Sequence, residues 1–175
     1  MEIEKGETVS DRVRIHLTKP ENPGIKYTYT ISFDPKKLTR KFEGYVEAKV
    51  ASVRATEEPE AENIAVNVLD GKEATRWSAE KEQSLFLELE QETEIDTYIM
   101  SMYYGHTRFN AFEVYVSVDG KDYKLAYAGR TSGETESHEY YDLGKQRAKY
   151  IRVDFHGASN ATWNSVTEAA VAKKQ

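Results

Sequence analysis

Apolar and polar residues alternate along most of the chain after residue 80. Apolar residues occupy every second position in residues 85–89, 112–118 and 151–155. A period of two is typical of a β-strand that buries one of its two faces. Residues 98–104 have the same kind of apolar face and an apolar Ile99 opposite it. We therefore predict four strands here, and we expect the strand at 98–104 to be covered on both sides.

Turn sequences rich in glycine separate these predicted strands. They are LDGKEA, SVDGKDY, AGRTSGE and DLGKQR, and the Asp-Gly pair of SVDGKDY favours a tight hairpin because it readily adopts positive φ. No long amphipathic helix is present in the pattern, and the best short candidates are residues 62–69 and 34–39. Many short strands at even spacing predict an all-β fold, an antiparallel β-sandwich.

The first fifty residues have a different pattern. They predict two strands, at residues 12–18 and 26–33, around the loop KPENPG, where two prolines and a glycine interrupt the extended chain. We therefore divide the chain into a β-rich N-terminal extension, residues 1–48, and a main domain, residues 49–172. Two strands alone are marginally stable, so the sequence leaves open whether the extension folds separately.

Composition excludes several classes of partner. The 175 residues are 39% hydrophobic and 31% charged, which is typical of a globular protein, and the formal net charge is −6. Because nucleic-acid binding needs clustered Lys and Arg, no nucleic-acid partner is expected. No apolar run is long enough to span a bilayer, so no membrane insertion is expected. The absence of cysteine excludes disulfides and thiolate metal sites.

Sequence signatures of catalysis are missing. The chain contains no phosphate-binding glycine loop, no Gly-x-Ser-x-Gly and no His-Glu-x-x-His. Its four histidines lack the paired spacing of a zinc site. A carboxylate pair for glycoside hydrolysis stays open, because such partners meet only in the folded chain. We expect a protein that is not an enzyme by itself, with the role of an accessory module of a polysaccharide-degrading enzyme left open.

The segment NVLDGKEATRW concentrates oxygen ligands in a tight turn. Asp70, Gly71 and Thr75 lie close together in it. Calcium takes about six to eight oxygen ligands, and a loop that turns back on itself can supply carbonyl oxygens together with a carboxylate. The alternative interpretation is an ordinary Asp-Gly turn, which is common in loops. Trp77, which ends the segment, is expected to pack in the core.

Three segments, in order, resemble a known family. They are NVLDGKEATRWSA, YYGHTRFNAFEVYVSVDGKDY and SGETESHEYYDLGKQRAKYIRVDFHGASNATWNSVTEAAV. Together they resemble the discoidin, or coagulation factor 5/8 type C, domain, and they look closest to the family 32 carbohydrate-binding modules of polysaccharide lyases, alginate lyases in particular. The resemblance covers about residues 50–171 and leaves out residues 1–48. It implies a galactose-binding-domain-like jelly-roll β-sandwich that binds glycans with loops at one end.

The resemblance also implies a structural calcium near the first loop. Carried over to this sequence, the side chains of Asp70, Thr75 and Glu168 are ligands, and the backbone carbonyl of Lys72 contributes to the shell. The family often has Asp or Asn at the position of Lys72, so the site depends on that residue donating only its carbonyl. Residues 169–170, both alanine, are a second departure, because the family more often has a β-branched residue after the glutamate.

The resemblance places the sugar site in two loops. Sugars bind against a flat aromatic face, and Arg can grip a sugar carboxylate through two hydrogen bonds. Arg108 is the strongest candidate, because its loop shows no structural need for a guanidinium. Trp163 has two interpretations, a stacking platform for a sugar or a residue packed on the end of the sandwich. The other candidates are Tyr104, His106 and Asn110 in the first loop, His156 and Asn164 near the second, and Arg76, for which an ion pair is the alternative.

The functional prediction is a non-catalytic carbohydrate-binding module that binds a polysaccharide or a glycan terminus, with calcium as its structural cofactor. An acidic and a neutral glycan are both compatible with the sequence. The negative net charge does not exclude an acidic glycan, because charges are screened beyond about 8–10 Å and a local cluster of Arg and His can still attract a carboxylate. The alternative is a structural or decoration protein, for example of a virion or a cell surface, that uses the same fold for protein contacts. The extension then provides contacts in an assembly or to a parent enzyme.

Localisation stays open at this point. The first twelve residues, MEIEKGETVSDR, lack the basic start and the apolar segment of a secretory signal. An extracellular or surface location is expected only if the chain is a fragment of a secreted protein.

Overall fold

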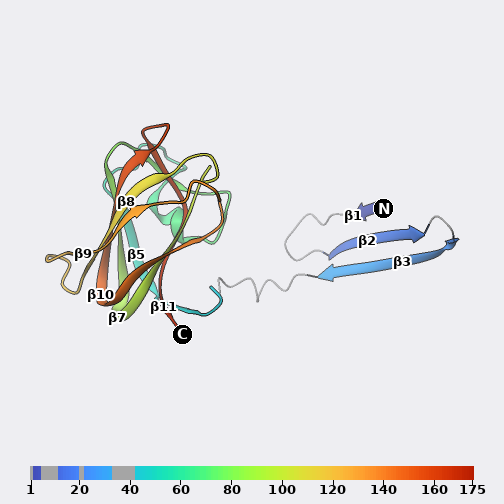
Figure 1. The fold of residues 1–175 in the computed structure, drawn as a ribbon, viewed down its shortest axis with the longest axis horizontal. Helices are drawn as coiled ribbons and strands as arrows, with labels where there is room; N and C mark the ends of the chain where they lie inside the picture. The colour runs from blue at the N-terminus through green and yellow to red at the C-terminus, as the bar shows by residue number, and fades with distance from the viewer. Residues whose placement is uncertain (1, 5–11, 20–21, 33–41) are drawn as a thin grey trace. The chain divides into compact units, whose positions relative to one another are not determined.

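A computed structural model describes residues 2–4, 12–19, 22–32 and 42–175. The chain divides into two compact units, Met1–Lys41 and Phe42–Gln175, and each is described by itself (Figure 1). The second unit carries all the candidate site residues named above.

The N-terminal unit contains a three-stranded antiparallel sheet. Its order is β1-β2-β3, with β1 at Glu2–Glu4, β2 at Arg12–Lys19 and β3 at Asn22–Ser32. β2 and β3 lie where the sequence pattern predicts strands, and β1 has no counterpart in that prediction. The helix considered at residues 34–39 lies outside the described residues.

The second unit begins earlier than the predicted domain boundary. Residues 42–48 were expected to belong to the extension, but β4 (Tyr45–Glu47) pairs with Ala172, Lys173 and Lys174 of the last strand. Phe42 is buried against the same sheet. The sequence pattern does not predict β4, because a strand of three residues is too short to show a period of two.

The second unit is an antiparallel β-sandwich, as predicted, and two long strands organise it. β7 (Gln83–Met102) and β10 (Glu139–Ala158) are each 20 residues long, and each runs through both sheets (Figure 1). Register shifts near the middle of β10, between Asp142 and Gln146 and between Ala148 and Tyr150, mark the passage from one sheet to the other.

The first sheet has five strands in the order β5-β7-β10-β8-β9. Residues 83–89 of β7 lie between β5 (Val50–Ala55) and residues 150–155 of β10. Next to β10 come β8 (Asn110–Ser117) and then β9 (Lys124–Arg130).

The second sheet is built on the other halves of the long strands. Residues 93–102 of β7 pair with residues 139–148 of β10 on one side and with β11 (Trp163–Lys174) on the other. β4 and β6 (Trp77–Glu80) pair with different parts of β11.

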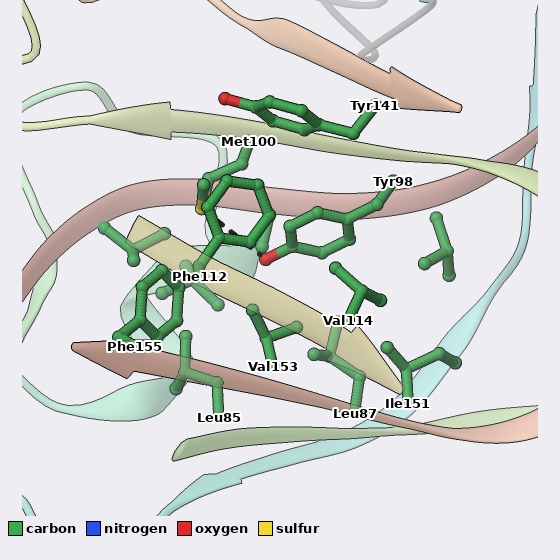
Figure 2. Packing of buried hydrophobic residues seen from close by; sticks show 14 of the residues in the cluster. Leu85, Leu87, Tyr98, Met100, Phe112, Val114, Tyr141, Ile151, Val153 and Phe155 are labelled. Atoms are coloured by element: carbon green, nitrogen blue, oxygen red, sulfur yellow. Dashed lines mark hydrogen bonds between the residues drawn. The ribbon is translucent and has the colours of Figure 1, made fainter. Parts of the chain in front are cut away.

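The core lies between the two sheets and is made by the predicted alternation. Leu85 and Leu87 from the first sheet face Tyr98 and Met100 from the second, and all four are at most 1% exposed (Figure 2). Burial in this apolar setting raises the pKa of the Tyr98 hydroxyl, which donates a hydrogen bond to Sδ of Met100 at 3.7 Å.

Two further sequence predictions about the core are confirmed. Ile99 is fully buried on the outer side of the second sheet, where it packs with Phe42 and Ala170, so its strand is covered on both faces. Trp77 is also fully buried and lies 5.7 Å from the ring of Phe155. Its indole N–H donates a hydrogen bond to a backbone carbonyl at 3.0 Å.

Helical structure is minimal in the described residues. The segment considered as a helix at residues 62–69 contains one 3-10 turn, η1 (Ala65–Leu69). Within the part of the chain that the structure describes, no helix has the length and apolar character needed to span a membrane.

Candidate functional site

Four loops meet at one end of the sandwich. β7 and β10 each have one half in the first sheet and the other half in the second, so the two ends of each strand lie at the same end of the sandwich. At this end Phe155 of β10 pairs with Gln83 of β7, and Val166 of β11 pairs with Met102 of β7. The connections at this end include residues 70–76, 103–109, 131–138 and 159–162.

Gly105 allows two of these loops to pack closely against each other. A Cβ at this position would lie 2.4 Å from the backbone oxygen of Thr135, so the loops 103–109 and 131–138 approach more closely than any other residue would allow. The loop after β10 is tied to the same place, because the backbone N–H of Ser159 donates to the carbonyl of Phe109 at 2.8 Å.

An aromatic and charged cluster occupies this end. The rings of Tyr103 and Tyr104 lie 4.2 Å apart, and the guanidinium of Arg76 stacks 4.2 Å from the ring of Tyr103. Nδ1 of His106 lies 3.1 Å from Oε1 of Glu136. We call these five residues the loop cluster.

Tyr104 is the most exposed aromatic part of the cluster. It is 48% exposed and has a positive φ of 56°, which is unusual for a residue with a side chain. Glu136 holds this conformation, because its Oε1 accepts the backbone N–H of Tyr104 at 2.9 Å. The hydrogen bond with Tyr103 is the main cause of a raised pKa for the Tyr104 hydroxyl.

A cavity of about 290 Å³ opens beside the loop cluster. It offers carboxylate and hydroxyl groups together with one apolar wall, which is the mixture that a polyhydroxylated ligand requires. Its lining residues are Glu73, Met102, Tyr103, Glu136, Ser137 and Thr167.

Sequence reasoning missed most of this lining. The segment that contains Glu136 and Ser137 shows only a turn and a family resemblance in the sequence. At the pair Tyr103 and Tyr104, the sequence favours Tyr104 as the site residue. The roles of these lining residues depend on which loops meet, and no period or motif within one segment carries that information.

Arg108 supports the loop rather than facing the cavity. Its Nη2 donates to the carbonyl of Tyr103 at 3.3 Å, and its Nε is buried with no hydrogen-bond partner among the described residues. The guanidinium thus has a hydrogen-bonding role within the loop, and the binding of sugar by Arg108 stays a prediction.

Asn110 and Asn164 are structural as well. They are 1% and 0% exposed, and Nδ2 of Asn110 donates to Oδ1 of Asn164 at 3.1 Å. The Asn164 amide also accepts the backbone N–H of Gly157 and donates to the carbonyl of Lys81, at 2.8 and 2.7 Å. Both side chains are used inside the protein, which corrects their placement in the sugar site.

Trp163 and His156 lie around the turn between β6 and β7. Trp163 pairs with Glu80 in the β6–β11 ladder and is half-buried, so packing accounts for part of its surface. His156 is exposed, with Nδ1 3.9 Å from Oε1 of Glu82.

The proposed calcium ligands converge in part. Oγ1 of Thr75 lies 2.9 and 2.8 Å from the two carboxylate oxygens of Asp70 and 3.0 Å from the carbonyl oxygen of Lys72. Gly71 turns the loop with a φ of 77°. These are hard oxygen donors of the kind that calcium prefers, so the residues present fit the ion.

Glu168 is the distant carboxylate that the resemblance adds to this set. Glu168 lies on β11 and is 2% exposed. η1 packs against β11, and the loop that contains Asp70 follows η1 directly. The described residues contain no cluster of three or more Asp, Glu, His or Cys that would hold a metal by themselves. Backbone carbonyls would therefore have to complete the shell.

Comparison with known proteins identifies the relatives of this chain. The family model named F5/8 type C domain matches residues 52–169. A solved structure of truncated AlyQ with CBM32 and alginate lyase domains is similar with a TM-score of 0.71 and 29% identity, over 74% of this chain and 34% of that chain. The present chain thus spans about a third of that structure.

Two smaller solved structures match over most of their length. The CBM32 of AlyQ in complex with 4,5-unsaturated mannuronic acid has a TM-score of 0.69 and 30% identity, over 72% of this chain and 97% of that chain. A pectin-binding carbohydrate-binding module has a TM-score of 0.68 and 28% identity, over 71% and 91%. No match was found among curated protein sequences.

Proposed function

Because the chain belongs to the F5/8 type C domain family and is homologous to family 32 carbohydrate-binding modules, we propose that it is a non-catalytic module that binds a polysaccharide or a glycan terminus at the loop cluster. The observation that carries this proposal is the placement of Tyr103, Tyr104, His106 and Arg76 beside a cavity of about 290 Å³.

The exposed ring of Tyr104 provides the stacking surface. A sugar ring presents C–H groups on one face, which pack against an aromatic ring, while its hydroxyl groups remain free for hydrogen bonds. Glu73 and Ser137 line the cavity next to this ring and can accept and donate such bonds.

The cluster also has groups that suit an acidic sugar. The guanidinium of Arg76 stacks on Tyr103, and its Nε donates a hydrogen bond to Ser78. Its other N–H groups make no ion pair with a carboxylate of the described residues, so they are available to a ligand carboxylate. Nδ1 of His106 lies 3.1 Å from Oε1 of Glu136, and a protonated His106 would reduce the repulsion between Glu136 and a ligand carboxylate. The solved modules bound to an unsaturated mannuronic acid and described as pectin-binding support a uronate-containing glycan as the ligand.

Calcium belongs to this proposal as a structural cofactor. Asp70, Thr75 and Glu168 would bind it through their side chains and Lys72 through its carbonyl. The ion would hold the loop 70–76 in one conformation. Since this loop carries Glu73 and Arg76, a fixed loop positions two residues of the sugar site.

The direct test is a glycan-array screen of the full chain, followed by calorimetry with the best oligosaccharide for wild type, Tyr104→Ala and Arg76→Gln. We expect each variant to bind at least tenfold more weakly, which corresponds to about 1.4 kcal/mol. Tyr140→Ala is the matched control, because Tyr140 is 46% exposed, stacks on Tyr45 at 5.1 Å and does not line the cavity beside the loop cluster. Equal binding by all four proteins, or no glycan bound by folded wild type, would reject the loop site.

A second candidate function rests on the N-terminal unit. Met1–Lys41 is compact by itself and has its own three-stranded sheet. We propose that this unit makes contacts to a parent enzyme or within an assembly, as a structural or decoration protein would need. Light scattering on the full chain and on residues 42–175 tests this, since self-assembly limited to the full chain would support it.

A further inference from the structure

The outer face of the first sheet carries a row of alternating cationic and aromatic residues. Arg54 on β5 pairs with Phe86 on β7, Phe86 pairs with Arg152 on β10, and Arg152 pairs with Tyr115 on β8. Their sequence neighbours, such as Leu85, point into the core. This row therefore crosses four strands on the side of the sheet that faces away from the core.

The aromatic rings hold the two guanidinium groups in place. Cζ of Arg54 lies 3.8 Å from the centre of the Phe86 ring. Cζ of Arg152 lies 4.3 Å from the ring of Tyr115 and 5.1 Å from that of Tyr123. A stacked guanidinium keeps the N–H groups at its edge available, and less rotamer entropy is lost when it binds an anion.

A second cavity, of about 310 Å³, lies along this row and outside the loop cluster. It has aromatic walls, two cationic side chains and two carboxylates. The turn after β8 forms part of its rim, since a Cβ on Gly120 would lie 3.3 Å from the Tyr150 ring. The lining residues are Ser52, Arg54, Phe86, Leu87, Glu88, Asp119, Gly120, Lys121, Tyr123 and Tyr150.

The carboxylates at this cavity are already engaged. Oδ1 of Asp119 accepts the backbone N–H groups of Lys121 and Asp122, each at 2.9 Å. Glu88 pairs with Lys149 at 3.4 Å. In contrast, no carboxylate within residues 42–175 lies at ion-pairing distance from Arg54 or from the ammonium group of Lys121.

We propose that this face, named here the sheet-face site, is a second binding surface for an acidic polysaccharide chain. Arg54 and Lys121 bind carboxylates of the chain, and a sugar ring packs against Tyr150 in the cavity. This inference concerns a surface other than the loop cluster and holds or fails independently of it.

An extended chain fits this surface better than a single sugar. Arg54 and Arg152 are separated by one intervening strand, so they lie roughly 10 Å apart at about 4.8 Å per strand. A ligand that contacts both must cross several strands. Nucleic acid fits less well, because its binding needs many phosphate contacts, while this face mixes its cations with Glu88 and Asp154 on a chain of net charge −6.

The test measures retardation of the full chain in native gels that contain alginate, with fully methyl-esterified polyuronate as the uncharged comparison. The site variant is Arg54→Gln with Lys121→Gln. The matched control is Arg147→Gln with Lys49→Gln, which removes the same charges from exposed positions outside both sites. Tyr104→Ala, made alone and together with each double variant, removes the contribution of the loop cluster.

We expect the site variant to bind alginate at least tenfold more weakly than wild type, because it removes two cationic groups whose charge-assisted hydrogen bonds are each worth on the order of tenfold in affinity. Calorimetry with the short oligosaccharide of the loop cluster should be unchanged. Residual alginate binding by Tyr104→Ala should weaken with added salt and disappear when the site variant is added. The esterified polymer should not respond to the site variant.

Three results would overturn the sheet-face site. One is equal alginate retardation for the site variant and the matched control. Another is complete loss of alginate binding by Tyr104→Ala alone. The third is a site variant that loses binding to poly-glutamate as strongly as to alginate, since the surface would then recognise acidic peptides rather than sugars. None of these results contradicts the loop cluster, and the second would assign all alginate binding to it; its own test uses the short oligosaccharide.

Discussion

Single residues at the loop end divide into those that face a ligand and those that hold the end together. Asn164 shows the second role most clearly, because its amide makes hydrogen bonds to three other segments while being fully buried. An Asn next to a Trp in a polar loop looks like a sugar contact in sequence. In the folded chain it is part of the core.

Asn164→Ala should therefore act on stability. Removing the amide leaves the Gly157 N–H, the Lys81 carbonyl and the Asn110 amide without their partner, so we expect a loss of about 3 kcal/mol in the free energy of unfolding. Urea denaturation measures it. Asn160→Ala, at an exposed position in the neighbouring turn, is the control and should change stability by less than about 0.5 kcal/mol. A stable Asn164→Ala protein with weakened glycan binding would return Asn164 to the sugar site.

Asp119 gives a prediction about pH. Hydrogen bonds from the backbone N–H groups of Lys121 and Asp122 lower its pKa from 3.8 to about 2 in the folded protein. Because the folded pKa lies below the unfolded one, the carboxylate stabilises the fold above 3.8, and this contribution is lost as the pH falls toward about 2.

Asp119→Asn should accordingly be less stable than wild type at neutral pH, and the difference should shrink as the pH falls through this window. Urea midpoints of both proteins across the acidic range measure the difference. A constant difference at all pH values would show that the carboxylate charge does not stabilise this turn.

At the scale of elements, loops that are distant in sequence depend on one another. Gly105→Ala tests this for the loops 103–109 and 131–138, because the added Cβ would collide with the backbone oxygen of Thr135. We expect a loss of about 1–3 kcal/mol in stability, as for other overpacked sites, and at least tenfold weaker glycan binding, because Glu136 moves with its loop.

Gly129→Ala is the matched control for this change. The three atoms nearest to its Cβ would be the hydroxyl oxygen and two ring carbons of the Tyr127 side chain, whereas Gly105 would meet a backbone oxygen of the facing loop. Thermal unfolding and calorimetry compare the two variants. Unchanged glycan binding by Gly105→Ala would mean that the two loops do not need their close approach.

The loop between η1 and β6 gives a prediction about calcium. Excess calcium should raise the free energy of unfolding of wild type by about 2.7 kcal/mol at a hundred times the dissociation constant, and EDTA should remove the gain. Asp70→Ala should abolish the response, while Glu73→Gln in the same loop should keep it. If thermal melts of wild type are the same with calcium and with EDTA, the Asp-Gly segment is an ordinary turn.

The whole molecule divides into two compact units. A protein of residues 42–175 contains all the strands of the sandwich and both proposed binding surfaces. We expect it to fold with the same melting temperature as the sandwich in the full chain and to bind the short oligosaccharide within a factor of about two. Differential scanning calorimetry and titration calorimetry test this. Loss of oligosaccharide binding on deletion would place part of the site in residues 1–41.

The sequence by itself determined the all-β class, the strands at 85–89 and 151–155, most of the strand at 112–118, the burial of Trp77 and the double burial of Ile99. Val118 is the exception, because β8 ends at Ser117 and Val118 is 52% exposed. The sequence also carried the motifs of the family, because family motifs and alternation are both local properties of a chain. The side of a strand that faces the core follows directly from a period of two.

The tertiary structure alone decided which loops meet and which polar side chains are buried. The sequence predicts Arg108 and Asn164 as ligand contacts, but in the structure both side chains make hydrogen bonds within the protein. Glu136 and Tyr103, which the sequence does not predict as site residues, line the cavity. The row Arg54–Phe86–Arg152–Tyr115 also exists only after four strands pair in register. Strand register and loop contacts join residues far apart in the chain, so no local pattern records them.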